Sequence, residues 1–281
     1  LMGGFALVGA LGFDLWKTVR GDTSLYRSFY GTLKVKRYPV PQKKGGLVHL
    51  LDGRISHGFQ FAGSAYQGEP TAYFVPQSGV GRVLGQLQGP KMVVVLGLGV
   101  GTLSSYAEPG DHFEFFEVNP DVITAAQEDF TYLQHAGGAT HVRLGDGRLL
   151  ASELKAASVD VFVVDAFTGD AIPARLLTVE ALDLYWDRIK EHGVLAINVS
   201  NRHADLWKVV QAYARRRSFA LFRVRHTAPS PLGPYTSDWM LMSRSEDRLI
   251  SMNLSPWVKD VKTDVPWTDD YAPLYPILRG F

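Results

Sequence analysis

The sequence of 281 residues contains no cysteine. This excludes disulfides, thiolate metal sites and a cysteine nucleophile, and it agrees with a reducing compartment. The eight histidines lack a metal-ligand spacing such as HExxH, so we predict no metal site. An excess of either charge is also missing, because 29 Lys and Arg against 28 Asp and Glu give a net charge of +1. We therefore predict no nucleic-acid partner, and a small-molecule substrate fits better.

Long hydrophobic runs are absent except at the start of the chain. Residues 1–15 (LMGGFALVGALGFDL) carry one charge, Asp14, but are too few to cross a bilayer, which takes about 20 residues. The segment is interpreted as the end of a membrane helix cut from a longer chain, or as a packing helix. Basic residues follow it, and their positive charge predicts a cytoplasmic flank. A signal peptide is disfavoured, because the run has no basic lead.

After an N-terminal segment, 1–24, the pattern divides the chain into two domains. Residues 25–88 hold short alternating runs such as LKVKRYPV, GLVHLLDGRISHGFQF and TAYFVPQ, which predict a small domain of antiparallel strands. Residues 89–281 alternate apolar strands, turns and amphipathic helices. This alternation predicts an α/β fold, a Rossmann-like doubly wound and mostly parallel sheet that binds ligands at the carboxyl ends of its strands.

Three features, in sequence order, predict a nucleoside site in the second domain. An apolar strand runs into the turn GLGVG, whose glycines allow the backbone to approach a ligand closely. These glycines are Gly97, Gly99 and Gly101. The next strand ends in Glu117, 20 residues beyond Gly97, where a carboxylate can receive two ribose hydroxyls. A further strand leads to Asp146 and Gly147, which suit an adenine amino group and ring edge.

A nicotinamide enzyme would use a similar glycine loop and acidic residue. The loop lacks the GxGxxG spacing, however, because Thr102 follows Gly101. A GDG element behind a third strand is also typical of adenosylmethionine sites. We therefore predict that the chain binds S-adenosylmethionine or decarboxylated S-adenosylmethionine as a substrate, with no further cofactor.

The ordered motifs LLDG, Tyr73, GLGVG, EVNP, GDG, VVDAF and IPA resemble the spermidine synthases, the polyamine aminopropyltransferases, over about residues 25–245. More closely, they resemble the bacterial branch in which a synthase-like domain is fused to a membrane region. The resemblance implies a homodimer with a small β-domain and a Rossmann-like catalytic domain. It also implies a location at the cytoplasmic face of the bacterial inner membrane, or in the cytoplasm if residues 1–15 are only a packing helix.

The resemblance also assigns residues. The nucleoside contacts fall on the glycine turn, Glu117, Asp146, Gly147 and Pro173. Asp165 corresponds to the catalytic aspartate, which orients and deprotonates the attacking amine. We further expect Tyr73 and Tyr235 to flank the sulfonium through cation–π contacts, and Arg54 and His57 to bind a substrate carboxylate.

Three departures concern the half of the site that handles the amine. Val100 and Thr168 stand where the family has aspartates, and Ser56 stands where it has glutamine. Ammonium groups removed from water need nearby carboxylates, so these losses disfavour a diamine substrate. Asp170, two residues beyond the second lost aspartate, could restore an acceptor site.

The reaction therefore has several candidates. The first is a lyase, in which the carboxylate of adenosylmethionine attacks its own γ-carbon to give homoserine lactone and 5'-methylthioadenosine. The alternative is an aminopropyltransferase that uses decarboxylated adenosylmethionine and a diamine. A methyltransferase and a non-catalytic binding module remain further alternatives.

Overall fold

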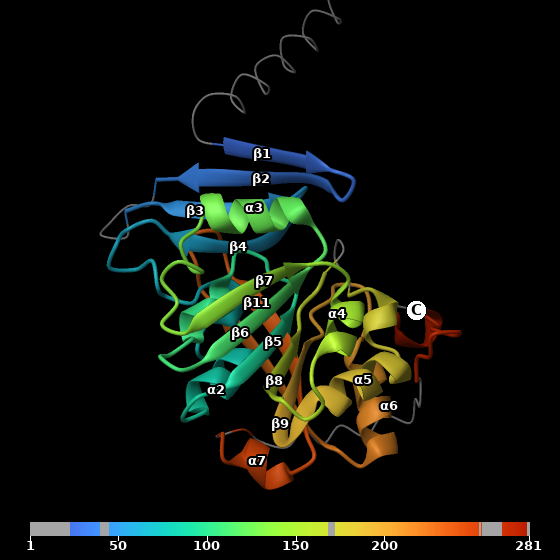
Figure 1. Ribbon diagram of the computed structural model, residues 1–281. Helices are drawn as coiled ribbons and strands as arrows, with labels where there is room; N and C mark the ends of the chain where they lie inside the picture. The colour runs from blue at the N-terminus through green and yellow to red at the C-terminus, as the bar shows by residue number, and fades with distance from the viewer. Residues whose placement is uncertain (1–22, 40–44, 168–171, 253, 255–265, 280–281) are drawn as a thin grey trace, which may run out of the picture.

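The computed structural model describes residues 23–39, 45–167, 172–252, 254 and 266–279. Two β-sheets make up its framework, a small one above a large one (Figure 1). The predicted N-terminal segment 1–24 lies outside the described residues, apart from Thr23 and Ser24, which begin the first strand. In the described part, no helix is both long and apolar enough to cross a membrane.

The small sheet is antiparallel, with its four strands in chain order. They are β1 (Thr23–Ser28), β2 (Gly31–Tyr38), β3 (Leu47–Asp52) and β4 (Ile55–Phe61). The turn between β3 and β4 contains Gly53 at φ +57°, a left-handed conformation that glycine adopts without strain. A register shift between Leu50 and Leu51 interrupts the regular hydrogen-bond ladder just before this turn. The hairpin from β3 to β4 therefore presents its tip toward the large sheet.

The large sheet has seven strands in the order β10-β11-β9-β8-β5-β6-β7. The parallel strands are β5 (Met92–Leu96), β6 (His112–Glu117), β7 (Ala139–Leu144), β8 (Val159–Val164) and β9 (Ile189–Asn198). β11 (Tyr235–Ser243) pairs antiparallel with both β9 and β10 (Ala220–Ala228), so β10 runs in the same direction as the parallel strands. The strand order reverses direction between β5 and β8. The predicted α/β class, Rossmann-like sheet and small antiparallel sheet are confirmed.

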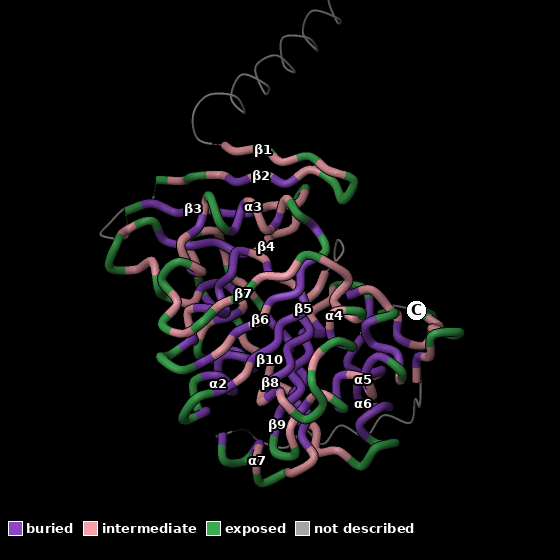
Figure 2. The backbone as a smooth tube through the Cα atoms, in the orientation of Figure 1, coloured by how far each residue is buried: buried purple, intermediate pink, exposed green. Residues whose placement is uncertain are grey.

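Helices cover both faces of the large sheet (Figures 1 and 2). They are α2 (Gly79–Gln86), α3 (Pro120–Glu128), α4 (Gly147–Glu153), α5 (Val179–Arg188), α6 (Trp207–Arg217) and α7 (Glu246–Ile250), with short 3-10 segments η1 (Ala72–Phe74), η2 (Thr102–Tyr106), η3 (Ala174–Leu176) and η4 (Tyr275–Ile277). Alternate residues of one strand enter different cores: Val93 and Val95 pack with α2 and α3, while Val94 and Leu96 pack with α5 and α6. Burial on both faces explains the nearly continuous apolar strands.

The alternation in the segment TAYFVPQ predicted a strand, but the segment does not form one. It forms η1, in which Ala72 has φ +55°, and leads into α2. Gly79 in α2 approaches the ring of Trp239 on β11 so closely that a Cβ atom there would lie 2.4 Å from the Cβ of Trp239. α2 therefore covers the large sheet, although the sequence boundary at residue 88 assigned it to the small domain.

The Asp129 carboxylate makes several of the contacts between the small sheet and α3. Asp129, which ends α3, accepts hydrogen bonds from the hydroxyls of Ser24 at 3.1 Å and Tyr26 at 2.7 Å. The same carboxylate forms an ion pair with Arg37 on β2. These contacts hold the small sheet over the carboxyl ends of the parallel strands, where ligands bind in folds of this class.

Candidate active site

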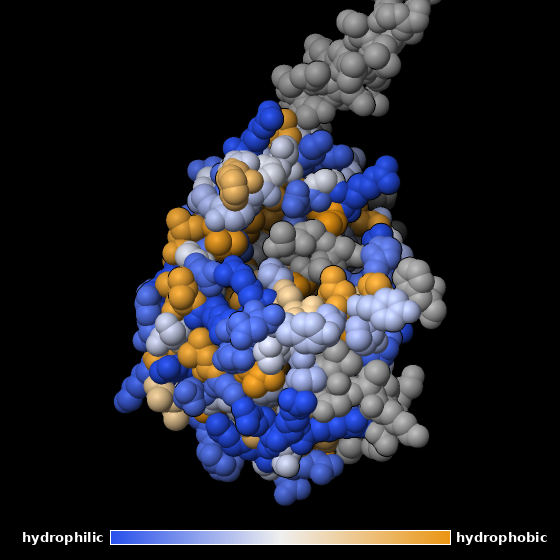
Figure 3. Space-filling model, turned by 90° about the vertical axis from the view of Figure 1, so that its right-hand side faces the viewer, coloured by the Kyte–Doolittle hydropathy of each residue, from blue (hydrophilic) through white to orange (hydrophobic). Residues whose placement is uncertain are grey.

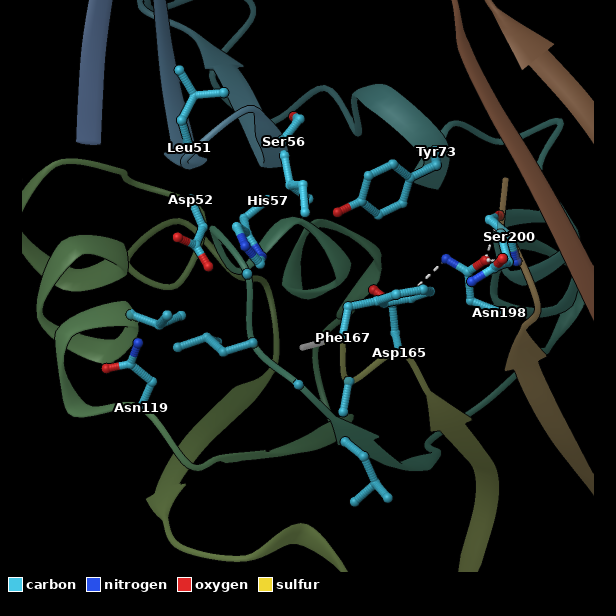
Figure 4. A pocket seen from close by; sticks show the side chains of 18 of the residues that line it. Leu51, Asp52, Ser56, His57, Tyr73, Asn119, Asp165, Phe167, Asn198 and Ser200 are labelled. Carbon is cyan, nitrogen blue, oxygen red and sulfur yellow. Dashed lines mark hydrogen bonds between the residues drawn. The ribbon is translucent and has the colours of Figure 1, made fainter. Parts of the chain in front are cut away.

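A cavity of about 920 Å³ lies between the two sheets. The hairpin tip of the small sheet forms one wall, and the carboxyl ends of β5, β6, β8 and β9 form the other (Figure 4). A space-filling view shows hydrophobic residues scattered among hydrophilic ones on one side of the molecule, with a hollow beneath the small sheet (Figure 3). The cavity therefore occupies the ligand position predicted from the sheet topology.

The glycine turn after β5 forms the floor of the cavity. Gly97 (φ +95°) and Gly99 (φ +55°) have left-handed backbones and line the cavity. A Cβ atom on Gly97 would lie 2.6 Å from the carbonyl oxygen of Asp165, and one on Gly99 would lie 2.8 Å from that of His57. Both positions need glycine because other backbone segments pass directly against them. Gly101 packs beside Leu133 instead and does not line the cavity.

Glu117 ends β6 next to this turn. Its carboxylate accepts hydrogen bonds from the backbone N–H groups of Leu98 at 3.0 Å and Asn119 at 2.9 Å. Burial raises the pKa of Glu117, and the backbone hydrogen bonds oppose that change. Each oxygen keeps a further acceptor position, and the residue lines the cavity. The geometry is suited to the two hydroxyls of a ribose.

Asp146 and Gly147 take different positions at the start of α4. Gly147 lines the cavity, whereas the Asp146 carboxylate caps the helix by accepting the N–H of Arg148 at 2.9 Å and pairs with Arg175. Burial acts to raise the pKa of Asp146, but its hydrogen bonds outweigh burial and lower it. Pro173 lines the same side of the cavity. The Asp146 carboxylate is thus occupied within the protein, and its predicted contact with adenine would have to compete with Arg175.

Asp165 follows β8 and lines the cavity opposite the hairpin (Figure 4). Burial raises its pKa to about 7, although a hydrogen bond from Asn198 opposes the rise. The Asn198 amide donates to Asp165 Oδ1 at 2.6 Å and accepts from the Ser200 hydroxyl at 2.6 Å. A carboxyl group with a pKa near neutrality, held in one orientation, is suited to accept a proton.

Asn198 and Ser200 were missed in the sequence. Asn198 is the polar end of the apolar strand β9, which pairs with β8, so its position at a strand's carboxyl end was the available signal. Ser200 links it further, because its hydroxyl accepts the backbone N–H of Asp238 at 2.9 Å. Asp238 in turn pairs with Arg223. The carboxylate of Asp165 is thus the end of a hydrogen-bonded series that crosses β9, β11 and β10.

Aromatic and hydroxyl groups form the wall nearest the small sheet. The Tyr235 hydroxyl forms a hydrogen bond of 3.1 Å with Ser56 Oγ, in which either oxygen can be the donor. Ser56 Oγ forms another, of 2.9 Å, with His49 Nε2. The rings of Tyr73 and Tyr235 lie 6.4 Å apart, and the Tyr73 hydroxyl points into the cavity (Figure 4). Burial raises the pKa of both tyrosines and lowers that of His49 to about 4, so all three side chains are neutral near pH 7. His49 was not predicted.

The hairpin tip also brings Asp52, Arg54 and His57 to the cavity. Figure 4 shows Asp52 and His57 side by side. Burial lowers the pKa of His57, and the charge of Asp52 opposes that change. His57 Nε2 is buried and has no hydrogen-bond partner among the described residues. Arg54 is exposed. Asp52 therefore supplies a further cavity carboxylate besides Asp165, Glu117 and Asp238, one that the predicted site did not include.

No family model matches the chain. A polyamine aminopropyltransferase from Vibrio vulnificus is 33% identical over 114 residues, which span 39% of this chain and 38% of that protein. The chain therefore matches well under half the length of this curated relative.

Solved structures match over more of the chain. A probable spermidine synthase from Corynebacterium glutamicum superposes with a TM-score of 0.63 at 18% identity, covering 80% of this chain and 81% of that one. Spermidine synthase from Thermotoga maritima gives a TM-score of 0.56 at 16% identity, covering 82% and 75%. The chain has the spermidine synthase fold. The resemblance to that family, predicted from the ordered motifs, is confirmed, while the fusion to a membrane region stays a prediction.

Within the spermidine synthase fold, the three departures can be located in part. Val100 is fully buried beneath the hairpin, where a Cβ atom on Gly58 would lie 2.8 Å from it, and it does not line the cavity. Ser56 takes part in the contacts with His49 and Tyr235. Thr168 and Asp170 lie outside the described residues. In the described part of the chain, no group of three or more His, Asp or Glu residues could hold a metal ion.

Proposed function

We propose that this chain is an enzyme that transfers an alkyl group, the aminopropyl group of decarboxylated adenosylmethionine, to an amine and releases 5'-methylthioadenosine. The observation that carries the proposal is Asp165: a carboxyl group with a pKa of about 7, oriented by Asn198, which lines the same cavity as Glu117 and the glycine turn and lies beside Gly97. The likeness to an aminopropyltransferase in sequence and to spermidine synthases in fold supports it.

In this proposal the glycine turn and Glu117 hold the nucleoside. The neutral amine attacks the methylene carbon bonded to the sulfonium, the new C–N bond forms as the C–S bond breaks, and the electron pair of that bond neutralises sulfur. Asp165 accepts the proton that the nitrogen loses. Tyr73 and Tyr235 present aromatic rings to the sulfonium, and cation–π attraction of about 0.5–2 kcal/mol would favour binding of the cationic donor.

This order of candidates reverses the one drawn from sequence, which placed the lyase first. The lyase was favoured because Val100 and Thr168 leave the amine half without two carboxylates. Asp52 and Asp165 both line the cavity, however, so an ammonium group still has carboxylates beside it. The comparisons also favour the transferase, and they offer the lyase no support.

One chromatographic experiment separates the candidates. Purified protein is incubated with decarboxylated adenosylmethionine plus putrescine, and in parallel with adenosylmethionine alone. We expect 5'-methylthioadenosine in the first reaction and none in the second. Methylthioadenosine from adenosylmethionine alone would establish the lyase instead, adenosylhomocysteine would indicate a methyltransferase, and no product from any mixture would favour a binding module. Asp165→Asn serves as the inactive control.

The assembly and location follow the same family pattern. We propose a homodimer, which light scattering of the purified chain tests directly, since a monomer mass would contradict it. Attachment to the cytoplasmic face of a bacterial membrane through the N-terminal segment remains a proposal for the full-length protein. Its test is the distribution of that protein between membrane and soluble fractions.

A further inference from the structure

The amine half of the cavity has more positive groups than a site for cations needs. Five arginines line the cavity: Arg54, Arg175, Arg202, Arg225 and Arg279. Two are paired outside the cavity, because Arg175 contacts Asp146 and Arg279 contacts Asp205. In the described part of the structure, the other three form no ion pair and donate no side-chain hydrogen bond, and all three are exposed. Three guanidinium groups are therefore available to a ligand.

Two of these arginines belong to the same wall. Arg225 lies on β10 directly opposite Asp238 of β11. Arg202 lies in the loop after β9, which runs beside the start of β11 because Val199 N–H donates to the Asp238 carbonyl at 2.8 Å. Arg279 fixes this loop by donating to the Asn201 carbonyl at 2.8 Å. The loop that carries Arg202 is thus anchored at two points.

Arg54 approaches from the opposite wall. It belongs to the tip of the β3–β4 hairpin, beside Asp52, and faces the same cavity. The two histidines of this wall add no positive charge, since burial lowers the pKa of both His49 and His57. Among the described residues that line the cavity, the positive charge therefore comes from the arginines.

Some carboxylates of the cavity are already engaged by other groups of the protein. Asp238 is paired with Arg223, and Glu117 holds backbone N–H groups on the nucleoside side. Among the described lining residues, Asp52 and Asp165 remain for an ammonium group and for proton transfer. A simple diamine together with a decarboxylated donor brings only cations, which the three arginines repel. A substrate that carries both an ammonium group and a carboxylate matches the two kinds of group.

We propose that this cavity selects a substrate bearing a carboxylate, an α-amino acid group, which Arg202 and Arg225 on one wall and Arg54 on the other bind. Guanidinium groups suit this task because their planar donors match the two carboxylate oxygens. The carboxylate belongs either to the amine acceptor or to an intact adenosylmethionine donor. The inference rests on the proposed alkyl transfer and names the substrate class for it: the group transferred is aminopropyl from the decarboxylated donor, or 3-amino-3-carboxypropyl if the donor is intact adenosylmethionine.

Two pairs of compounds that differ by one carboxylate test the inference. Ornithine and putrescine form the acceptor pair, and adenosylmethionine and decarboxylated adenosylmethionine form the donor pair. Release of methylthioadenosine is measured for all four combinations and for each donor alone. We expect kcat/KM for one carboxylated partner to exceed that of its decarboxylated twin at least tenfold. A preference in the acceptor pair identifies the acceptor as the source, and a preference in the donor pair identifies the donor.

Variants connect the preference to the arginines. In the double variant Arg202→Gln/Arg225→Gln we expect the preference to fall below threefold. Arg27→Gln is the matched control, because Arg27 is exposed on β1 and does not line the cavity, and it should retain the full preference. Raising the salt concentration should weaken the preference in the unmodified protein, since contacts at the cavity mouth are screened.

The inference fails if decarboxylated donor and putrescine form the best pair, or if the preference survives in the double variant. Either result would leave the proposed transfer intact. If no combination releases methylthioadenosine, the proposed function itself fails. Calorimetry then decides the inference separately: protein saturated with methylthioadenosine is titrated with ornithine and with putrescine, and free protein with adenosylmethionine and with its decarboxylated form. Equal affinities within both pairs overturn the inference.

Discussion

Two parts of the cavity are built in different ways: the part proposed to hold the nucleoside, called the nucleoside wall, and the part proposed to receive the amine, called the amine wall. The nucleoside wall comes from consecutive strand ends of one sheet, and its contacts are backbone groups and one carboxylate, Glu117. The amine wall combines side chains far apart in the chain, such as Ser56 and Tyr235, which are 179 residues apart. Backbone groups offer the same contacts as long as the turn keeps its glycines, whereas a wall made of side chains can change its ligand by single substitutions. We therefore expect the first to bind a constant group and the second to set specificity.

The largest expected effect is that of replacing Asp165. Asp165→Asn should lower the rate of transfer by about 10³-fold, because loss of a general base typically costs 10²–10⁴-fold. Affinity for methylthioadenosine, measured by calorimetry, should change less than threefold. In the unmodified protein the rate should rise with pH through about 7, as Asp165 loses its proton. A rate that does not depend on pH between 6 and 8 would contradict this role.

The same substitution has a consequence for stability. The pKa of Asp165 is about 7 in the folded protein, against about 3.9 for an unfolded chain. The folded state therefore binds the proton more tightly, and ionisation of Asp165 destabilises the fold as the pH rises from about 4 to 7. Asp165→Asn should raise the free energy of unfolding by about 1–3 kcal/mol at pH 8, with a gain that disappears below pH 4. Denaturant unfolding of both proteins at pH 8 and below pH 4 measures these free energies. A variant less stable than the unmodified protein at pH 8 would contradict the prediction.

The next effect tests the nucleoside wall alone. Glu117→Ala should weaken binding of methylthioadenosine and adenosylmethionine alike, by about 10–100-fold, since hydrogen bonds to a charged group contribute about 1.5–3 kcal/mol each. Glu117→Gln is the matched control, because it keeps the size of the side chain and one acceptor oxygen. Unchanged affinity of the Ala variant in calorimetry would remove Glu117 from the site.

A smaller effect tests the support of Asp165. Asn198→Ala removes the hydrogen bond that favours the ionised carboxylate, so the pKa of Asp165 should rise further. We expect kcat to fall about tenfold at pH 7 and the acid limb of its pH profile to move to higher pH. The affinity for methylthioadenosine should not change. An equal loss of rate at every pH would indicate a merely structural role.

The smallest effect belongs to the amine wall. Tyr235→Phe removes the hydroxyl that contacts Ser56 but keeps the ring beside Tyr73. If the ring acts on the sulfonium by cation–π attraction, kcat/KM should fall less than threefold, whereas Tyr235→Leu should cost about 3–30-fold. Steady-state kinetics of the two variants compares hydroxyl and ring directly. Equal losses in both would mean that the hydroxyl carries the effect.

The elements of the nucleoside wall follow one another in short local motifs, so their positions could be inferred from the sequence. Gly97 and Glu117 line the cavity, and their contact with a nucleoside stays a prediction. Asp146 was placed at the correct turn, but Arg175, 29 residues away, engages its carboxylate. The competing contact depends on how η3 folds back over α4, which local spacing does not specify.

The amine wall was less accessible to prediction. His49, Ser56 and Tyr235 meet only because the small sheet docks over the start of β11. Asn198 required the knowledge that β9 neighbours β8 in the sheet. The 3-10 segment η1 was hidden by an alternating pattern that arises from tertiary burial of Ala72 and Phe74. Each of these features depends on the packing of elements that are distant in the chain.

The contact between Gly58 and Val100 limits how this site could evolve. The hairpin closes on the turn so tightly that position 100 has no exposure to the cavity. A carboxylate restored there alone would be buried without a partner, and such a group is costly. Return to an acidic pocket would therefore require coordinated substitutions in the hairpin and the turn, with an unfavourable intermediate. The charge of the cavity is therefore insulated from single substitutions at position 100.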